Sequence, residues 1–91
     1  MLDKAIYLVE IVNLMNGLIE KGITFKFQTA FDGYQIIVYD ENDERDWDAI
    51  CHGFSYGHEE GLLEIYGSIV DENVGDSVEG YLTAEEILAR L

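Results

Sequence analysis

The stretch ITFKFQTAFDGYQIIVY, residues 23–39, holds two runs of alternating apolar and polar side chains on either side of Asp32-Gly33. A period of two residues is typical of β-strands, whose successive side chains point to opposite faces. Asp-Gly favours a two-residue turn between antiparallel strands, because a type I′ turn needs positive φ at both positions. The stretch therefore predicts a β-hairpin with two core-side pairs, Phe27 with Val38 and Thr29 with Ile36.

Residues 3–21, before the hairpin, carry apolar side chains at helical spacing. Asp3 is a candidate N-cap of this helix and Gly22 a candidate C-terminal stop. The predicted buried face consists of Ala5, Leu8, Ile11, Val12, Met15, Leu18 and Ile19, widened by Ile6, Val9 and Leu14. We interpret it as a helix lying across a sheet, with a homodimer seam as the alternative.

The chain after the hairpin predicts one more strand and two more helices. Alternation over residues 48–56 predicts the strand, with Ile50, His52, Phe54 and Tyr56 on one face and Cys51, Gly53 and Ser55 on the other. Residues 58–66 indicate a short helix, and residues 68–82 a loop with room for a short strand. Thr83 and Glu86 match a capping box that opens a terminal helix. The expected fold is one α+β domain over residues 1–91, in the order αβββαα, with helices packed on a three-stranded antiparallel sheet.

Charge is distributed unevenly along the 91 residues, which carry 19 acids, 5 bases and a net charge of −14. Residues 1–39 hold four acids and three bases, whereas residues 40–91 hold fifteen acids and two arginines. This balance argues against direct binding to nucleic acid or to an anionic membrane, both of which attract lysine and arginine. It favours attraction to a basic partner.

The segment YDENDERDWD, residues 39–48, concentrates six carboxylates and one arginine. Such a run is often only a solvated loop, but aromatic side chains amid charge are typical of interface anchors. Trp47 fits either an anchor or a lid on the core. The predicted partner-binding residues are Tyr39, Asp40, Glu41, Asp43, Glu44, Asp46, Trp47, Asp48, Asp71, Glu72, Asp76 and Glu79.

Catalytic and metal-binding patterns are weak. His58-Glu59-Glu60 begins like a zinc-protease helix, but Leu62 stands where the second histidine is needed. Strand alternation directs Cys51 away from His52, and a fourth zinc ligand at a usual spacing is missing. We therefore expect a non-catalytic protein without metal or cofactor, and keep a small metal-dependent hydrolase using His52 and His58 as an alternative.

Cys51 is the single cysteine, so an internal disulfide is impossible and a reducing cytoplasm is expected. The N-terminal residues lack the basic and small-residue features of a signal peptide.

The words GFSYGHEEGLLEIYG, residues 53–67, and VEGYLTAEEI, residues 78–87, resemble short acidic proteins of bacteriophages and mobile elements of Gram-positive bacteria. The expected plan, with acids concentrated after the second strand, is similar to one class of anti-CRISPR inhibitors. That resemblance implies a DNA mimic in the cytoplasm of a bacterial host, bound to the basic cleft where an RNA-guided nuclease reads its PAM. From the first helix we expect a monomer, and the alternative is another non-catalytic phage or prophage interaction protein, dimeric through that helix.

Overall fold

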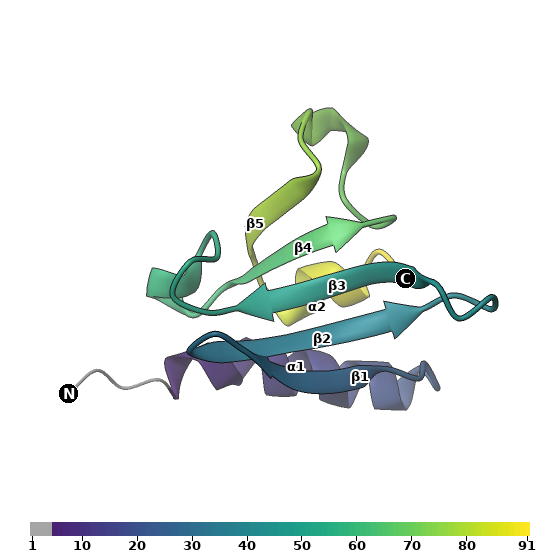
Figure 1. Ribbon diagram of the computed structural model, residues 1–91, viewed down its shortest axis with the longest axis horizontal. Helices are drawn as coiled ribbons and strands as arrows, with labels where there is room; N and C mark the ends of the chain where they lie inside the picture. The colour runs from purple at the N-terminus through teal and green to yellow at the C-terminus, as the bar shows by residue number, and fades with distance from the viewer. Residues whose placement is uncertain (1–4) are drawn as a thin grey trace.

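A computed structural model describes residues 5–91, and Asp3, the predicted N-cap, lies outside them. The described chain forms two α-helices, five strands and two short 3-10 helices (Figure 1). In chain order they are α1 (Ile6–Glu20), β1 (Lys26–Ala30), β2 (Gly33–Tyr39), β3 (Arg45–Cys51), η1 (His58–Glu60), β4 (Leu63–Gly67), η2 (Glu72–Val74), β5 (Val78–Leu82) and α2 (Ala84–Leu88).

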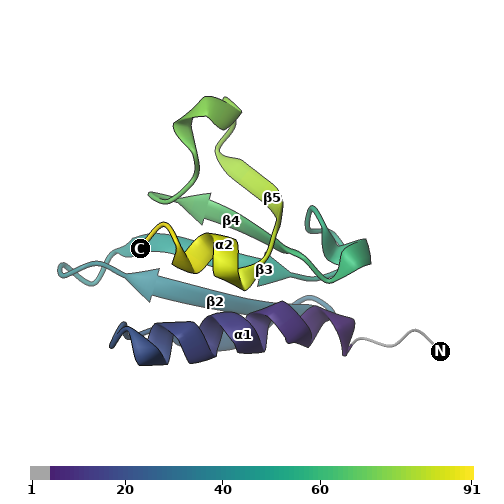
Figure 2. The ribbon, with the colours of Figure 1, turned by 180° about the vertical axis from the view of Figure 1, so that it is seen from behind.

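The five strands form one antiparallel sheet in the order β1-β2-β3-β4-β5, so each strand pairs with its neighbour in sequence. Both helices lie on the same face of this sheet, and the opposite face faces the viewer in Figure 1 (Figures 1 and 2). We call that helix-free side the open face. The α+β class is confirmed, whereas the predicted number of three strands is wrong.

The predicted hairpin forms as β1 and β2, but its register differs from the prediction. Phe27 pairs with Ile36, and Thr29 pairs with Tyr34. The turn residues are Phe31, whose φ is +56°, and Asp32, while Gly33 already belongs to β2. Gly33 keeps a negative φ and is needed for another reason, because a Cβ there would lie 2.0 Å from the carbonyl oxygen of Cys51. The two-residue shift keeps Phe27, Thr29, Ile36 and Val38 on one face, since side chains alternate with a period of two. Only Ile36 and Val38 are buried, however, and the predicted core positions of Phe27 and Thr29 are wrong because both side chains are exposed on the edge strand β1.

Helix α1 ends as its sequence predicts, and its buried face matches the predicted one in part, at Ile11, Leu14 and Leu18. The Ile23 amide donates to the Leu18 carbonyl at 2.9 Å, and the Gly22 amide donates to the Ile19 carbonyl at 3.0 Å. With Gly22 at φ +72°, these bonds make a Schellman motif. The buried side chains of α1 are Tyr7, Ile11, Leu14 and Leu18. The predicted core residue Ile19 is instead 65% exposed, and Val12 is 40% exposed.

The strand predicted over residues 48–56 is shorter in the structure and begins earlier, because the chain turns after Cys51. The Ser55 hydroxyl accepts from the His52 amide at 3.0 Å, and the Ser55 amide donates to the His52 carbonyl at 3.0 Å. Phe54 and Tyr56 therefore lie in a loop rather than on β3.

The helix predicted over residues 58–66 is also wrong. Only the three residues of η1 are helical there, and β4 begins at Leu63 after Gly61 and Leu62. Gly57 and Gly61 adopt φ of +97° and +70°, which interrupts a right-handed helix on both sides of η1. The predicted loop over residues 68–82 contains η2 and ends in β5, the edge strand opposite β1.

The terminal helix α2 is confirmed together with its capping box. The Thr83 hydroxyl accepts from the Glu86 amide at 3.2 Å, and the Glu86 carboxylate accepts from the Thr83 amide at 2.9 Å. Glu10 of α1 also accepts from the Ala84 amide at 2.7 Å, which joins the two helices at the start of α2.

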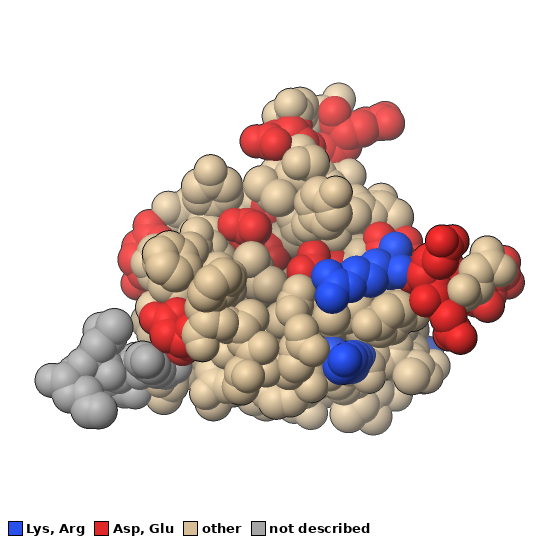
Figure 3. Space-filling view, viewed as in Figure 1, with Lys and Arg blue, Asp and Glu red and all other residues tan. Residues whose placement is uncertain are grey.

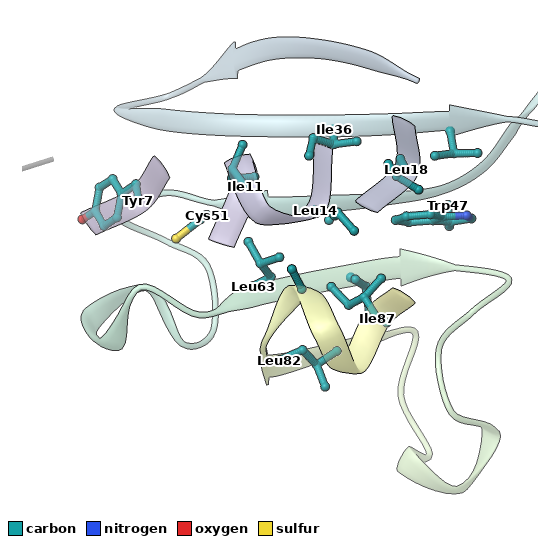
Figure 4. Packing of buried hydrophobic residues seen from close by; sticks show 14 residues of the cluster. Tyr7, Ile11, Leu14, Leu18, Ile36, Trp47, Cys51, Leu63, Leu82 and Ile87 are labelled. Atoms are coloured by element: carbon teal, nitrogen blue, oxygen red, sulfur yellow. The ribbon is translucent and has the colours of Figure 1, made fainter. Parts of the chain in front are cut away.

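The core lies between the sheet and the two helices (Figure 4). Its largest fully buried side chains include Ile11 and Leu14 from α1, Ile36 and Ile65 from the sheet, and Ile87 from α2. Close packing of the two helices depends on Gly17, where a Cβ would lie 2.2 Å from a methyl group of Leu88. The open face and the loops at the two ends of the strands are thus the surfaces that the helices do not cover.

Candidate functional site

The loop of residues 40–44, between β2 and β3, holds four carboxylates on an ordered backbone. We call it the acidic hairpin loop. Asp40 organises it, since its Oδ1 accepts from the Asn42 amide at 2.8 Å and from the Glu44 amide at 3.0 Å. The Asp40 amide in turn donates to the Glu44 carbonyl at 2.8 Å. Glu41, Asp43 and Glu44 are therefore exposed on a turn with a defined shape.

The adjoining part of β3 alternates between the open face and the core. Asp46 and Asp48 are half-buried, and the Asp46 carboxylate accepts from the Ser68 hydroxyl at the start of the β4–β5 connection. Trp47 points the other way and is only 3% exposed (Figure 4). Of the two interpretations left open for Trp47, the structure shows the one in which its ring packs in the core. Tyr39, at the end of β2, is 39% exposed.

Asp48 is the last member of a polar ladder that crosses three strands of the open face. The Gln28 amide nitrogen donates to the Gln35 side-chain oxygen at 2.7 Å, and the Gln35 amide nitrogen donates to the Asp48 carboxylate at 2.7 Å. Burial raises the pKa of Asp48 despite the opposing effects of Gln35 and nearby Arg45. The Asp48 carboxylate thus stabilises the sheet through its hydrogen bond with Gln35.

The connection between β4 and β5 presents a second group of predicted acids. Asp71, Glu72 and Asp76 are all exposed there. The Asp71 carboxylate accepts from the Asn73 amide at 2.9 Å, which fixes the start of η2. A shallow groove of about 340 Å³ runs beside these residues. It is lined by Tyr66, Gly67, Val70, Asp71, Glu72, Asp76 and Ser77.

Glu79, on β5, differs from the other predicted acids because its charge is neutralised. Its two carboxylate oxygens accept from Arg90 at 2.8 and 2.7 Å, and one of them also accepts from the Asp71 amide at 3.0 Å. This pairing lowers the pKa of Glu79 to about 2. Glu79 therefore ties β5 to the end of α2 and contributes little net negative field to a partner.

On the face shown in Figure 3, the carboxylates form separate groups rather than one continuous array. One group lies at the acidic hairpin loop and another at the β4–β5 connection, with mostly uncharged side chains between them. The structure thus brings Asp40, Glu41, Asp43 and Glu44 together in one loop, and places Asp71, Glu72 and Asp76 in another.

Cys51 and the two histidines serve local structure. Cys51 is fully buried, and burial raises its thiol pKa to about 11, so it is not a thiolate at neutral pH. His52 is 6% exposed and its Nδ1 accepts from the Phe54 amide at 3.1 Å, as expected for a buried, hydrogen-bonded histidine. The His58 ring contacts the Ser55 carbonyl at 2.6 Å. Within residues 5–91, His, Cys, Asp and Glu form no group suited to holding a metal ion.

The sequence did not reveal a third surface, formed by exposed aromatic side chains at the end of the sheet opposite the acidic hairpin loop. Phe31 and Phe54 are 80% and 78% exposed, and their ring centroids lie 5.4 Å apart. Phe31 lies in a turn, and alternation over residues 48–56 wrongly placed Phe54 on a strand that ends at Cys51. The positive φ of Phe31, which would have marked it, cannot be read from sequence.

The comparisons with known proteins give no relative. The chain matches no protein-family model, no curated protein and no solved structure. Over residues 5–91, the helices are too short or too polar for a bilayer span.

Proposed function

We propose that this protein is a non-catalytic, anionic inhibitor that occupies a basic nucleic-acid-binding cleft of another protein. The partner that we propose is an RNA-guided CRISPR nuclease of a bacterial host. The observation that carries the proposal is the acidic hairpin loop, in which backbone hydrogen bonds to the Asp40 carboxylate order a turn that carries three exposed carboxylates.

A cleft that binds nucleic acid is lined with arginine and lysine, and PAM-reading arginines form bidentate contacts with bases. Carboxylates compete for such groups through charge-assisted hydrogen bonds, which are stronger than neutral ones. Order in the loop matters because a preformed carboxylate pair loses less conformational entropy on binding than a flexible one. Asp71, Glu72 and Asp76 supply a second set of exposed anions for a cleft wide enough to reach them.

The test compares two variants with the same loss of charge. Glu41→Gln/Asp43→Asn removes two carboxylates from the acidic hairpin loop but keeps Asp40, which orders it. Asparagine also tolerates the φ of +62° at position 43. Glu60→Gln/Glu85→Gln removes two exposed carboxylates elsewhere on the surface.

The measurement is a pull-down from a bacterial lysate that contains RNA-guided nucleases, followed by binding to the purified nuclease with and without competing PAM-containing duplex DNA. We expect the hairpin variant to bind the nuclease about tenfold or more weakly, and the control variant to bind within about twofold of the wild type. Added salt and duplex DNA should both displace the wild type. Equal losses in the two variants, or binding that duplex DNA leaves unchanged, would contradict the proposal.

A further inference from the structure

The end of the sheet opposite the acidic hairpin loop carries a compact group of exposed aromatic rings. Phe31 lies in the β1–β2 turn, and Phe54 and Tyr56 lie in the loop after β3. They are 80%, 78% and 59% exposed, respectively. We call Phe31, Phe54, Tyr56 and the neighbouring Tyr81 the aromatic end. Single exposed aromatics are ordinary, but exposed rings in contact, such as those of Phe31 and Phe54, are typical of an interface.

The two phenylalanines are held in place by the backbone and by His52. The Phe31 ring lies 4.9 Å from the His52 ring, and the Phe54 ring lies 6.0 Å from it. His52 is itself buried and hydrogen-bonded to the Phe54 amide. Asp32 fixes the turn against the loop, since its Oδ1 accepts from the Gly53 amide at 2.7 Å. These contacts position the two phenylalanine rings next to each other on the surface.

Two carboxylates contact the tyrosines of the aromatic end. Glu59 accepts from the Tyr81 hydroxyl at 2.6 Å, and Glu64 accepts from the Tyr56 amide at 2.8 Å. The Tyr81 amide also donates to the Tyr56 carbonyl at 3.3 Å, which joins β5 to the same loop. Two of the three non-glycine residues with positive φ in residues 5–91, Phe31 and Tyr81, belong to the aromatic end.

The basic side chains of residues 5–91 are attached at other places. Lys26 begins β1 and Arg45 begins β3, whereas Phe31 and Phe54 follow the far ends of these strands. Lys26 is the first of the five residues of β1, so the turn that follows β1 lies about 16 Å from Lys26 at the usual rise per residue. Arg90 is paired with Glu79, and Lys21 follows the end of α1.

We propose that the aromatic end binds an arginine-containing segment of a partner protein. A guanidinium group stacks on aromatic faces while its N–H groups reach carboxylates, and the aromatic end offers both. A nucleic acid would meet carboxylates without a described lysine or arginine beside them, and a second copy of this end would meet its own charge. This surface is independent of the acidic hairpin loop and of the inhibitor function proposed above.

The test uses hexa-arginine and hexa-lysine peptides in 150 mM salt, with amide chemical shifts of the labelled protein as the measurement. We expect hexa-arginine to shift amides of residues 31–32 and 52–57, and to bind there about fivefold more tightly than hexa-lysine. The variant Phe31→Leu/Phe54→Leu keeps the apolar bulk and removes the aromatic faces, so it should abolish the preference for arginine. Tyr66→Ala is the control, because Tyr66 is 57% exposed and lies on the open face.

Several results would overturn the proposal. Shifts confined to the acidic hairpin loop, or equal affinity for the two peptides, would do so. Undiminished arginine preference in the leucine variant would exclude aromatic stacking. Shifts of the same amides by an oligothymidine would indicate nucleic acid, and a dimer in sedimentation that Phe31→Leu/Phe54→Leu abolishes would indicate a second copy. In the variant Glu41→Gln/Asp43→Asn, the shift changes that hexa-arginine causes at the aromatic end should stay within about twofold of those in the wild type. This result separates the inference from the proposed inhibitor function.

Discussion

Glu79 shows how one side chain can convert an acid on the surface into a structural link. Its bidentate pair with Arg90 and its bond to the Asp71 amide connect β5, the end of α2 and the start of η2. Because the pair is partly shielded from water and geometrically favourable, we expect Glu79→Gln to lower the free energy of unfolding by about 1 kcal/mol at pH 7. Denaturant unfolding of both proteins measures this difference.

The difference should depend on pH in a defined direction. The pKa of Glu79 falls from 4.5 to about 2 on folding, so the unfolded chain binds the proton more readily. The stabilisation is therefore complete above pH 4.5 and is lost as the pH falls toward 2. Glu41→Gln is the control, because it removes an exposed carboxylate from the acidic hairpin loop. A difference between wild type and Glu79→Gln that stays constant from pH 7 to pH 2 would contradict this account.

At the scale of the element, α1 presents apolar side chains around much of its circumference, and tertiary packing selects the buried stripe. Leu14 is fully buried, whereas Ile19 is 65% exposed. We expect Leu14→Ala to lower the free energy of unfolding by about 3 kcal/mol through lost burial and a cavity. Ile19→Ala should change it by no more than about 0.5 kcal/mol. Thermal or denaturant unfolding checks both, and equal costs would place the buried stripe elsewhere on the helix.

The elements that the sequence predicts correctly are those with local signals. The Gly22 stop, the alternation over residues 23–39 and the Thr83–Glu86 capping box each act within a few residues of the chain. The helix prediction over residues 58–66 was wrong because Glu59 and Glu60 suit the N-terminus of a helix, while the positive φ of Gly57 and Gly61 cannot be read from the sequence. The hairpin register depends on close approach of Gly33 to the backbone of β3, which is a contact between distant residues.

The candidate site also has features that the sequence predicts and features that only the folded chain shows. The acidic hairpin loop could be predicted because a run of charged residues between two strands must form an exposed connection. The burial of Trp47 and the pairing of Glu79 with Arg90 depend on neighbours that only the folded chain supplies. The aromatic end combines two turns that are more than twenty residues apart, 21 in the case of Asp32 and Gly53, so local patterns cannot assemble it.

At the scale of the whole molecule, the net charge of −14 is a cost to folding as well as a resource for binding. Among residues 5–91, Arg90 with Glu79 is the only ion pair that a lysine or arginine forms, and His58 lies 3.7 Å from Glu59. Most carboxylates therefore repel one another, and salt screens that repulsion over about 10 Å at 0.1 M.

We therefore expect the thermal midpoint to rise when sodium chloride increases from about 10 mM to about 300 mM. A gain of about 1 kcal/mol would correspond to about 4–8 °C for a chain of this size. Glu41→Gln/Asp43→Asn should start from a higher midpoint at low salt and gain less, since the acidic hairpin loop concentrates the repulsion. A midpoint that falls with added salt would mean that attractive pairs dominate. A cationic partner at either end would relieve the same repulsion, so its stabilising effect should also be largest at low salt.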